Sequence, residues 1–392
     1  MTDPRIAFAG LLAVVNPSPG RSPADVEQSL LSLGPFPGWP ILFDHAARHR
    51  VTPLFAHRLK QLDWMAQTAF PLDIAERSRL ERVIRDAAFA EMASLAELQR
   101  LSDCLVRHGV EPILLKGLAL SRICFAAMGQ RTNRDIDLLI RPDELALCDR
   151  LLADLGYVRI EPAAGLAEPD AARWQILHKD WVYTHPVRRT IVELHYRLFD
   201  NDALARTIPL GQIERVDLFG QHSMLCFSGD ALLSYLALHG LLHSWSRLKW
   251  LIDYQIVRQS EWGARSTGRA VPDAALAVRV ANRLCDNLFG TDPPALETHG
   301  ISRTSLLVRT SVKAMADGGA GELEDTRFGT TVKNVSHYLI SFRPSYWLAE
   351  IRYDLADTSR DGDQADGRSS GPFKRVALWI ARKAGSASSE SK

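Results

Sequence analysis

The chain has 392 residues, which is enough for two or three domains or for one large core with additions. Hydrophobic residues make up 46% of the sequence and charged residues 24%, as in an ordinary globular protein. The 47 Lys and Arg residues nearly balance the 46 Asp and Glu residues, so the overall charge gives no argument for a nucleic acid or an anionic membrane as partner.

The cysteines and the N-terminal stretch indicate the cellular compartment. There are five cysteines, and no two have C-x-x-C spacing, so neither a disulfide framework nor a zinc ribbon is expected. The N-terminal stretch has no basic segment, and the chain has no run of about 18 uncharged apolar residues. The sequence therefore predicts a cytoplasmic protein with reduced thiols and no transmembrane helix.

The N-terminal part of the chain has a helical pattern. Residues 16–40 are rich in Pro, Gly and Ser and contain one helical piece at 23–33, and residues 39–62 carry an apolar helical face. From Pro71 to about His108, apolar residues recur mostly at spacings of three and four, which predicts one or two long helices. Residues 1–110 are therefore expected to form an N-terminal helical region.

At residue 111 the pattern changes from helical to strand type. The predicted order is a strand at 111–115, a helix at 118–127, a strand at 135–140, a helix from Pro142 to Gly156 and strands at 181–184 and 190–196. This order indicates a mixed α/β core over residues 111–200.

The C-terminal part is again predicted to be helical over residues 201–357. Asp230 is the predicted N-cap of a helix that runs to about Val257. Further helices are predicted at 271–292 and 303–316, a disordered loop at 358–371, a short basic amphipathic helix at Pro372–Ala384 and a disordered tail to Lys392. We expect the basic helix to dock on the body of the protein, and an anionic membrane surface is the alternative.

Two carboxylates stand at the start of one predicted strand. Asp135 and Asp137 are two residues apart, so they share a strand face while Ile136 and Leu138 point into the core. Such a pair can hold one or two divalent cations, and oxygen ligands favour Mg²⁺, with Mn²⁺ as the alternative. The pattern also occurs by chance at solvated strand starts, so its weight depends on its neighbours.

The turn before the first predicted helix of the core suits a phosphate. Gly117 allows close backbone approach, the free amides at a helix start favour an anion, and Lys116 adds a positive charge. A plain turn is the alternative. Arg131 is a candidate to neutralise a triphosphate or to pair with one of the two aspartates, and the sequence leaves both roles open.

A third carboxylate, Glu193, lies in the middle of an apolar strand. Burying it is costly unless it is solvated, paired or bound to a metal. If its strand lies beside the strand of Asp137, Glu193 becomes a third metal ligand or the base that takes a proton from an acceptor hydroxyl. A carboxylate on the open side of the sheet is the alternative.

Three segments together resemble the nucleotidyltransferase superfamily related to DNA polymerase beta, in particular the bacterial branch labelled nucleotidyltransferase family protein. They are L-L-K-G at 114–117, R-T-N-R-D-I-D-L-L-I at 131–140 and V-E-L-H-Y-R-L at 192–198, with flanking similarity at 46–54 and 238–253. The resemblance covers about residues 40–260. It implies an α+β fold, in which a small mixed-sheet nucleotidyltransferase core is flanked by N- and C-terminal helical regions.

The resemblance also implies site residues. Asp135, Asp137 and Glu193 would bind the metal ions, and Lys116 and Gly117 would form the phosphate loop. In the superfamily a serine commonly follows the glycine of this loop directly. Here none does, and Ser121 lies about one turn later.

Two histidines are four residues apart on a predicted helix in the C-terminal region. His239 and His243 share a face, and Arg247 lies near it. We expect a polar face turned toward the nucleotide or the acceptor. An interface with the α/β core and a zinc site are the alternatives.

Taken together, the sequence predicts a Mg²⁺-dependent enzyme that moves an NMP group from a nucleoside triphosphate such as ATP to an acceptor hydroxyl and releases pyrophosphate. The acceptor would be a small molecule, a glycan or a peptide, with polysaccharide or modified-peptide biosynthesis suggested by the resemblance. A long nucleic acid acceptor is disfavoured by the near-zero net charge. The alternatives are a non-catalytic nucleotide-binding or scaffold protein with a degenerate phosphate loop and, more weakly, a carboxylate-pair hydrolase.

Overall fold

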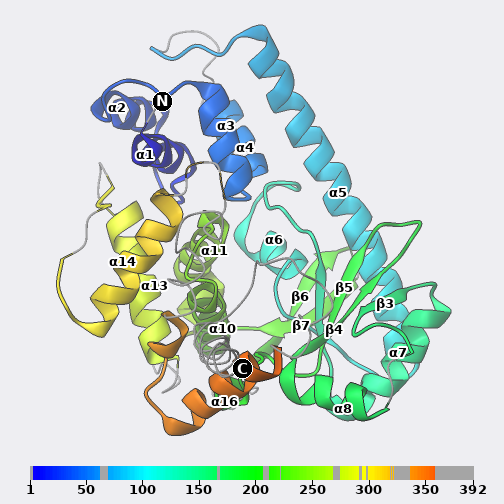
Figure 1. The fold of residues 1–392 in the computed structure, drawn as a ribbon. Coiled ribbons are helices and arrows are strands. Elements are labelled where there is room, and N and C mark those ends of the chain that lie inside the picture. The colour runs from blue at the N-terminus through cyan, green and yellow to red at the C-terminus, as the bar shows by residue number, and fades with distance from the viewer. Residues whose placement is uncertain are drawn as a thin grey trace, which may run out of the picture.

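Figure 1 shows the computed structural model of the chain, in which helices from both ends of the sequence lie beside a mixed β-sheet. The residues described are 3–61, 69–165, 168–205, 212–220, 222–267, 274–290, 294–296, 299–317, 319, 321 and 336–357. The predicted disordered loop, the basic helix Pro372–Ala384 and the tail lie outside the described residues. Within the described ranges, no helix has both the length and the apolar character needed to cross a bilayer.

The N-terminal region is helical, as predicted. Its helices are α1 (Pro4–Val15), α2 (Pro23–Ser32), α3 (Trp39–Arg48), α4 (Thr52–Gln61) and α5 (Ile74–Arg107). The long predicted pattern is a single helix of 34 residues, and it begins at a capping box in which Asp73 and Glu76 accept each other's backbone N–H. Figure 1 shows α5 running from the N-terminal helices to the sheet.

The sheet has seven strands in the order β3-β4-β5-β2-β1-β7-β6. The strands are β1 (Ile113–Leu114), β2 (Ile136–Leu139), β3 (Val158–Glu161), β4 (Asp180–Thr184), β5 (Ile191–His195), β6 (Ile213–Phe219) and β7 (His222–Phe227). β2 pairs in parallel with β5, and β1 with β7, while the other neighbours are antiparallel. The helices between these strands are α6 (Leu118–Cys124), a short 3₁₀ helix (Pro142–Glu144) continued by α7 (Leu145–Asp154), α8 (Glu168–Leu177) and α9 (Asp202–Ala205).

Four of the strands lie where the sequence predicts them, and three were not predicted. The unpredicted hairpin of β6 and β7 extends the sheet beyond residue 200, the predicted end of the core, because β7 pairs with the two-residue strand β1. β6 alternates buried Val216 with exposed Arg215 and Asp217, which is a one-sided strand pattern.

The two faces of the sheet differ. One face packs against α5 and α7 through buried apolar side chains such as Leu98, Leu152, Ile136, Leu138 and Leu194. The alternate residues of the same strands, including Asp137 and Glu193, therefore point to the opposite face. The sheet thus separates an apolar core from a polar face.

Apart from α12, the helices of the C-terminal region share one core with α1, α3 and α4. They are α10 (Gly229–Leu242), α11 (Leu248–Gln259), α12 (Glu261–Ala264), α13 (Ala275–Phe289), α14 (Arg303–Ala316) and α16 (Pro344–Asp357). The two helical regions that the sequence separates are thus packed together, and Figure 1 shows α13 and α14 beside α10 and α11.

The single helix predicted from Asp230 to Val257 is in fact two helices. The N-cap is Ser228, and Asp230 accepts hydrogen bonds from the backbone N–H and hydroxyl of Thr267. The chain turns after α10 because Ser244 and Trp245 have positive φ angles of 51° and 49°. Beyond the turn, α11 packs against α6.

Candidate functional site

The polar face of the sheet brings two of the predicted carboxylates together. β2 and β5 are parallel neighbours, and their register places Asp137 directly beside Glu193. Ile136 and Leu138 are buried on the other face, as the alternation predicts. The sequence-based condition that the Glu193 strand lie beside the Asp137 strand is therefore met.

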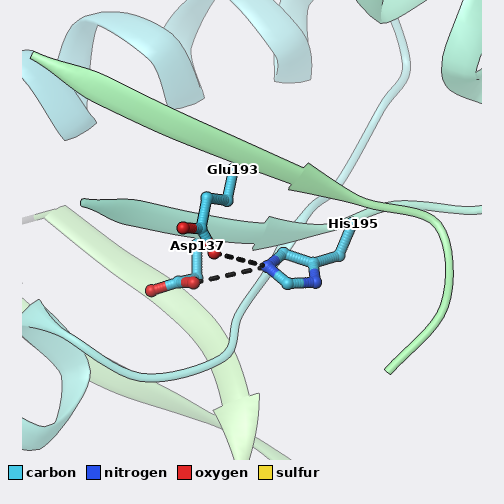
Figure 2. A group of neighbouring side chains, drawn as sticks. All are labelled: Asp137, Glu193 and His195. Atoms are coloured by element: carbon cyan, nitrogen blue, oxygen red, sulfur yellow. Dashed lines mark hydrogen bonds and ion pairs between the residues drawn. The ribbon is translucent and has the colours of Figure 1, made fainter. Parts of the chain in front are cut away.

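A histidine that the sequence analysis did not select completes this group. His195 follows Glu193 by two residues, so both side chains lie on one face of β5. Its Nε2 is 3.3 Å from Oδ1 of Asp137 and 3.4 Å from Oε2 of Glu193. Dashed lines mark both contacts in Figure 2. The signal for His195 was its Glu-x-His spacing in the V-E-L-H-Y-R-L segment.

A fourth carboxylate lies across the next strand pair. Asp180 of β4 pairs in register with His195, and its Oδ2 is 3.7 Å from Nε2 of that imidazole. The same carboxylate forms an ion pair with Lys179. Neither Asp180 nor Lys179 was anticipated, because the predicted strand begins only at Trp181, whereas β4 begins at Asp180.

Lys116 contacts the aspartates. Its Nζ is 2.6 Å from a carboxylate oxygen of Asp137 and 3.6 Å from Oδ1 of Asp135. Lys116 lies there because β1 pairs with β2 in antiparallel orientation. The pairing extends one residue past β1, where the Leu115 N–H donates to the Asp137 carbonyl at 3.1 Å. The predicted phosphate-loop lysine thus stands among the carboxylates.

Gly117 makes the turn that follows. Its φ of 65° and ψ of −117° form a conformation that only glycine adopts readily, and the residue is the N-cap of α6. A strand can therefore pass directly into a helix at this position.

The ionisable groups of the site change one another's pKa values. Burial alone raises the pKa of Asp137, but the charge of Lys116 and the hydrogen bond from His195 outweigh it and hold the pKa below its usual value. Burial is likewise opposed at Glu193, where His195 and Lys116 lower the pKa to about 2. Burial lowers the pKa of His195, while its hydrogen bonds to Asp137 and Glu193 more than compensate and raise it. Both carboxylates are therefore ionised at neutral pH.

Arg131 pairs with Asp253 of α11, and not with either aspartate of the D-x-D pair. Its Nε and Nη2 donate to the two oxygens of Asp253 at 3.0 and 2.9 Å, and both side chains are 3% exposed. Its Nη1 donates to the Gly117 carbonyl at 3.0 Å and to Asn133. Arg131 therefore ties the glycine turn to the C-terminal helices.

Ser121 belongs to the same network beneath the turn. It is buried, and its hydroxyl accepts a hydrogen bond from Nδ2 of Asn133 at 2.9 Å. Its predicted contact with nucleotide stays a prediction.

The predicted polar face of α10 is an aromatic cluster beside the site. The rings of His239 and His243 are 4.8 Å apart between centroids, His243 stacks on Trp250 at 4.9 Å, and the Arg247 guanidinium carbon is 5.6 Å from the Trp250 ring centre. Burial, His243 and Lys116 together hold the pKa of His239 well below its usual value.

A sheet whose polar face carries carboxylates from adjacent parallel strands, next to a glycine turn that starts a helix, is the arrangement expected of a nucleotidyltransferase core. Residues 37–290 match the model of the family described as "Uncharacterised nucleotidyltransferase". This match spans more than half of the sequence, and the chain belongs to that family. It confirms the predicted nucleotidyltransferase family and supports a transferase, in a mixed α/β fold with flanking helices.

Other comparisons add less. The chain is similar to the solution structure of the antibiotic-resistance factor ANT(2'')-Ia, with 11% sequence identity, a TM-score of 0.34 and coverage of 49% of this chain and 92% of that chain. A similarity of this extent carries no argument about the reaction. No match was found among curated proteins.

Proposed function

We propose that the protein transfers an NMP group from a nucleoside triphosphate to a hydroxyl group of an acceptor, in a reaction that requires Mg²⁺ or Mn²⁺ and releases pyrophosphate. The observation that supports this proposal is the registered pair of Asp137 and Glu193 on adjacent parallel strands, in a chain of the nucleotidyltransferase family. We place the reaction in the cytoplasm, with ATP as one donor and a small molecule, a glycan or a peptide as acceptor.

The residues present fit a divalent cation. Ligand atoms of Asp137, Glu193 and His195 lie within 4.8 Å of one another. Around them, the acidic side chains Asp135 and Asp180 are paired with Lys116 and Lys179, so the described site carries more carboxylates than ammonium groups. An ammonium already lies between the two aspartates of the D-x-D pair, which shows that this position accommodates positive charge.

The protein's own groups have separate tasks in this proposal. Asp135, Asp137 and Glu193 hold the cation, which when bound supplies charge neutralisation for the phosphates and lowers the pKa of the attacking hydroxyl. Of the two roles predicted for Glu193, that of ligand is favoured, because a carboxylate with a pKa of about 2 is a poor proton acceptor at neutral pH. The Gly117 turn and Lys116 bind the triphosphate at the start of α6.

The acceptor hydroxyl attacks the α-phosphorus in line with the bond to the departing pyrophosphate. Binding both reactants at one site would convert the encounter into an intramolecular step. Arg131 and Ser121 keep the glycine turn in place through Asp253 and Asn133, and their direct contact with nucleotide is part of the proposal.

Transfer of a radioactive α-phosphate from each of the four NTPs to a fractionated pool of small molecules, glycans and peptides tests the proposal. Wild-type protein should label an acceptor in the presence of Mg²⁺ or Mn²⁺, and Asp137→Asn should lower the rate by about 10³-fold. Asp143→Asn, which changes an exposed carboxylate of the 3₁₀ helix, is the matched control. Undiminished labelling by Asp137→Asn would contradict the assignment.

A non-catalytic nucleotide-binding protein is the second candidate. The engagement of Lys116 by both aspartates favours it, because the lysine of the phosphate loop is then committed to the carboxylates. It predicts metal-dependent nucleotide binding by calorimetry with no pyrophosphate release under any acceptor condition.

A further inference from the structure

His195 is almost completely buried on the polar face of the sheet, with a side-chain exposure of 1%. Its polar contacts in the described structure are all made through Nε2, which faces carboxylates, while Nδ1 has no hydrogen-bond partner among the described residues. In Figure 2 the Nε2 edge of the ring points at both Asp137 and Glu193. A neutral or cationic imidazole in this position would serve only to join two anions that the sheet register already places side by side.

The spacing of these atoms matches the edges of a metal coordination shell. Around a cation with bonds of about 2.1–2.2 Å, ligands at right or tetrahedral angles are about 3.0–3.5 Å apart. The distances from Nε2 of His195 to Asp137 and Glu193 are 3.3 and 3.4 Å. All three ligand atoms lie within 4.8 Å of one another, so these residues are positioned to hold one ion between them.

The fourth carboxylate is excluded from this set by its partner. Asp180 is paired with Lys179 and lies 3.7 Å from Nε2 of His195, farther than the other two. Asp180 therefore lies outside the proposed ligand set.

We propose that His195 joins the carboxylates as a metal ligand through Nε2, and that the added nitrogen ligand makes the site select Mn²⁺ over Mg²⁺. Mg²⁺ is bound by oxygen ligands and retains its waters, whereas Mn²⁺, a first-row transition metal that carboxylates also bind, accepts an imidazole nitrogen as well. The three carboxylates predicted from the sequence give no such selection. The inference rests on the proposed function for the purpose of the metal, and metal preference itself is measurable without turnover.

The direct test is pulsed electron paramagnetic resonance of Mn²⁺ bound to the full chain, with a non-hydrolysable ATP analogue present. The wild-type spectrum should show hyperfine coupling to a ¹⁴N nucleus, and the coupling should change to that of ¹⁵N when the protein is labelled with ¹⁵N-histidine. Labelling assigns the nitrogen to the protein and not to adenine. Bound Mn²⁺ without any histidine nitrogen coupling would overturn the proposal, and this result needs no variant.

Variants measure the preference. Competition between Mn²⁺ and Mg²⁺ should give wild-type protein a Mn²⁺ affinity at least about tenfold higher, and His195→Asn should reduce this ratio to below about threefold. His108→Asn, an exposed histidine at the end of α5, should leave the ratio unchanged. An unchanged ratio in folded His195→Asn would refute the proposal.

The two proposals fail separately. If Asp137→Asn abolishes nucleotidyl transfer while Mn²⁺ shows no histidine coupling, the proposed function stands and the nitrogen ligand is refuted. If Asp137→Asn retains both transfer and metal affinity, the location of the metal site is refuted, and with it both proposals.

Discussion

The buried ion pair of Arg131 and Asp253 allows a quantitative test of how the site is held to the C-terminal helices. Arg131→Met leaves the Asp253 carboxylate, which is 3% exposed, without the two hydrogen bonds of 3.0 and 2.9 Å that now compensate its burial. Breaking one side of a buried ion pair costs about 3–5 kcal/mol, so we expect the free energy of unfolding to fall by that amount. The Gly117 carbonyl loses its donor in the same variant.

Urea unfolding monitored by Trp fluorescence and by circular dichroism measures this loss. The double variant Arg131→Met/Asp253→Leu removes both charges, so it should be more stable than Arg131→Met by at least about 1 kcal/mol. Arg131→Lys, which keeps a charge but not the two-pronged contact, covers the case in which the methionine variant does not fold.

Two results would refute the reasoning. One is a loss below about 1 kcal/mol in Arg131→Met, which is the range of an exposed ion pair. The other is a double variant that is no more stable than the single variant. Unchanged nucleotide affinity in the double variant would show that the Arg131 guanidinium does not touch the triphosphate.

Three further predictions follow from single groups. Lys116→Gln removes the ammonium that competes for Asp137, so calorimetry without nucleotide should show a higher Mn²⁺ affinity than wild type, while NTP affinity falls; a loss of metal affinity would contradict this. Gly117→Ala should lower the free energy of unfolding by about 1–3 kcal/mol in urea titrations, because φ is 65° there, and an unchanged stability would be contrary to it. Burial and the charge of Arg48 hold the pKa of His49 well below 6.5, so the unfolded chain binds a proton that the folded protein does not. The free energy of unfolding should therefore fall as pH falls below about 6.5, by about 1.4 kcal/mol per pH unit. Urea titrations at pH 7.5 and 5.5 should show a smaller difference in the free energy of unfolding for His49→Gln than for wild type.

Local patterns in the sequence were sufficient for several features. The alternation around Asp137 predicts which side chains enter the core, since a strand has a period of two whatever its neighbours are. Gly117 was selected as the turn residue because its conformational freedom is a property of the residue itself. The helix predicted at 303–316 coincides with α14, and its apolar spacing is likewise local.

What the sequence could not supply was which segments lie together. The position of β7 beside β1, with β6 at the edge of the sheet, depends on pairing between distant segments, which no local sequence period encodes. The pairing of Arg131 with Asp253 joins residues 122 positions apart, and only the packing of α11 against the glycine turn makes the two side chains neighbours.

The composition of the site shows the same division. The sequence predicted Asp135, Asp137 and Glu193 as carboxylates on strands, and this suggested a metal-dependent reaction; in the structure Asp135 directly precedes β2. Only the tertiary structure decided that His195 joins Asp137 and Glu193, since that requires the parallel register of β2 and β5 in addition to the Glu-x-His spacing. Register is set by the burial of the apolar face of both strands, a collective property of the core, and it brings a nitrogen donor to a site whose sequence signal is purely acidic.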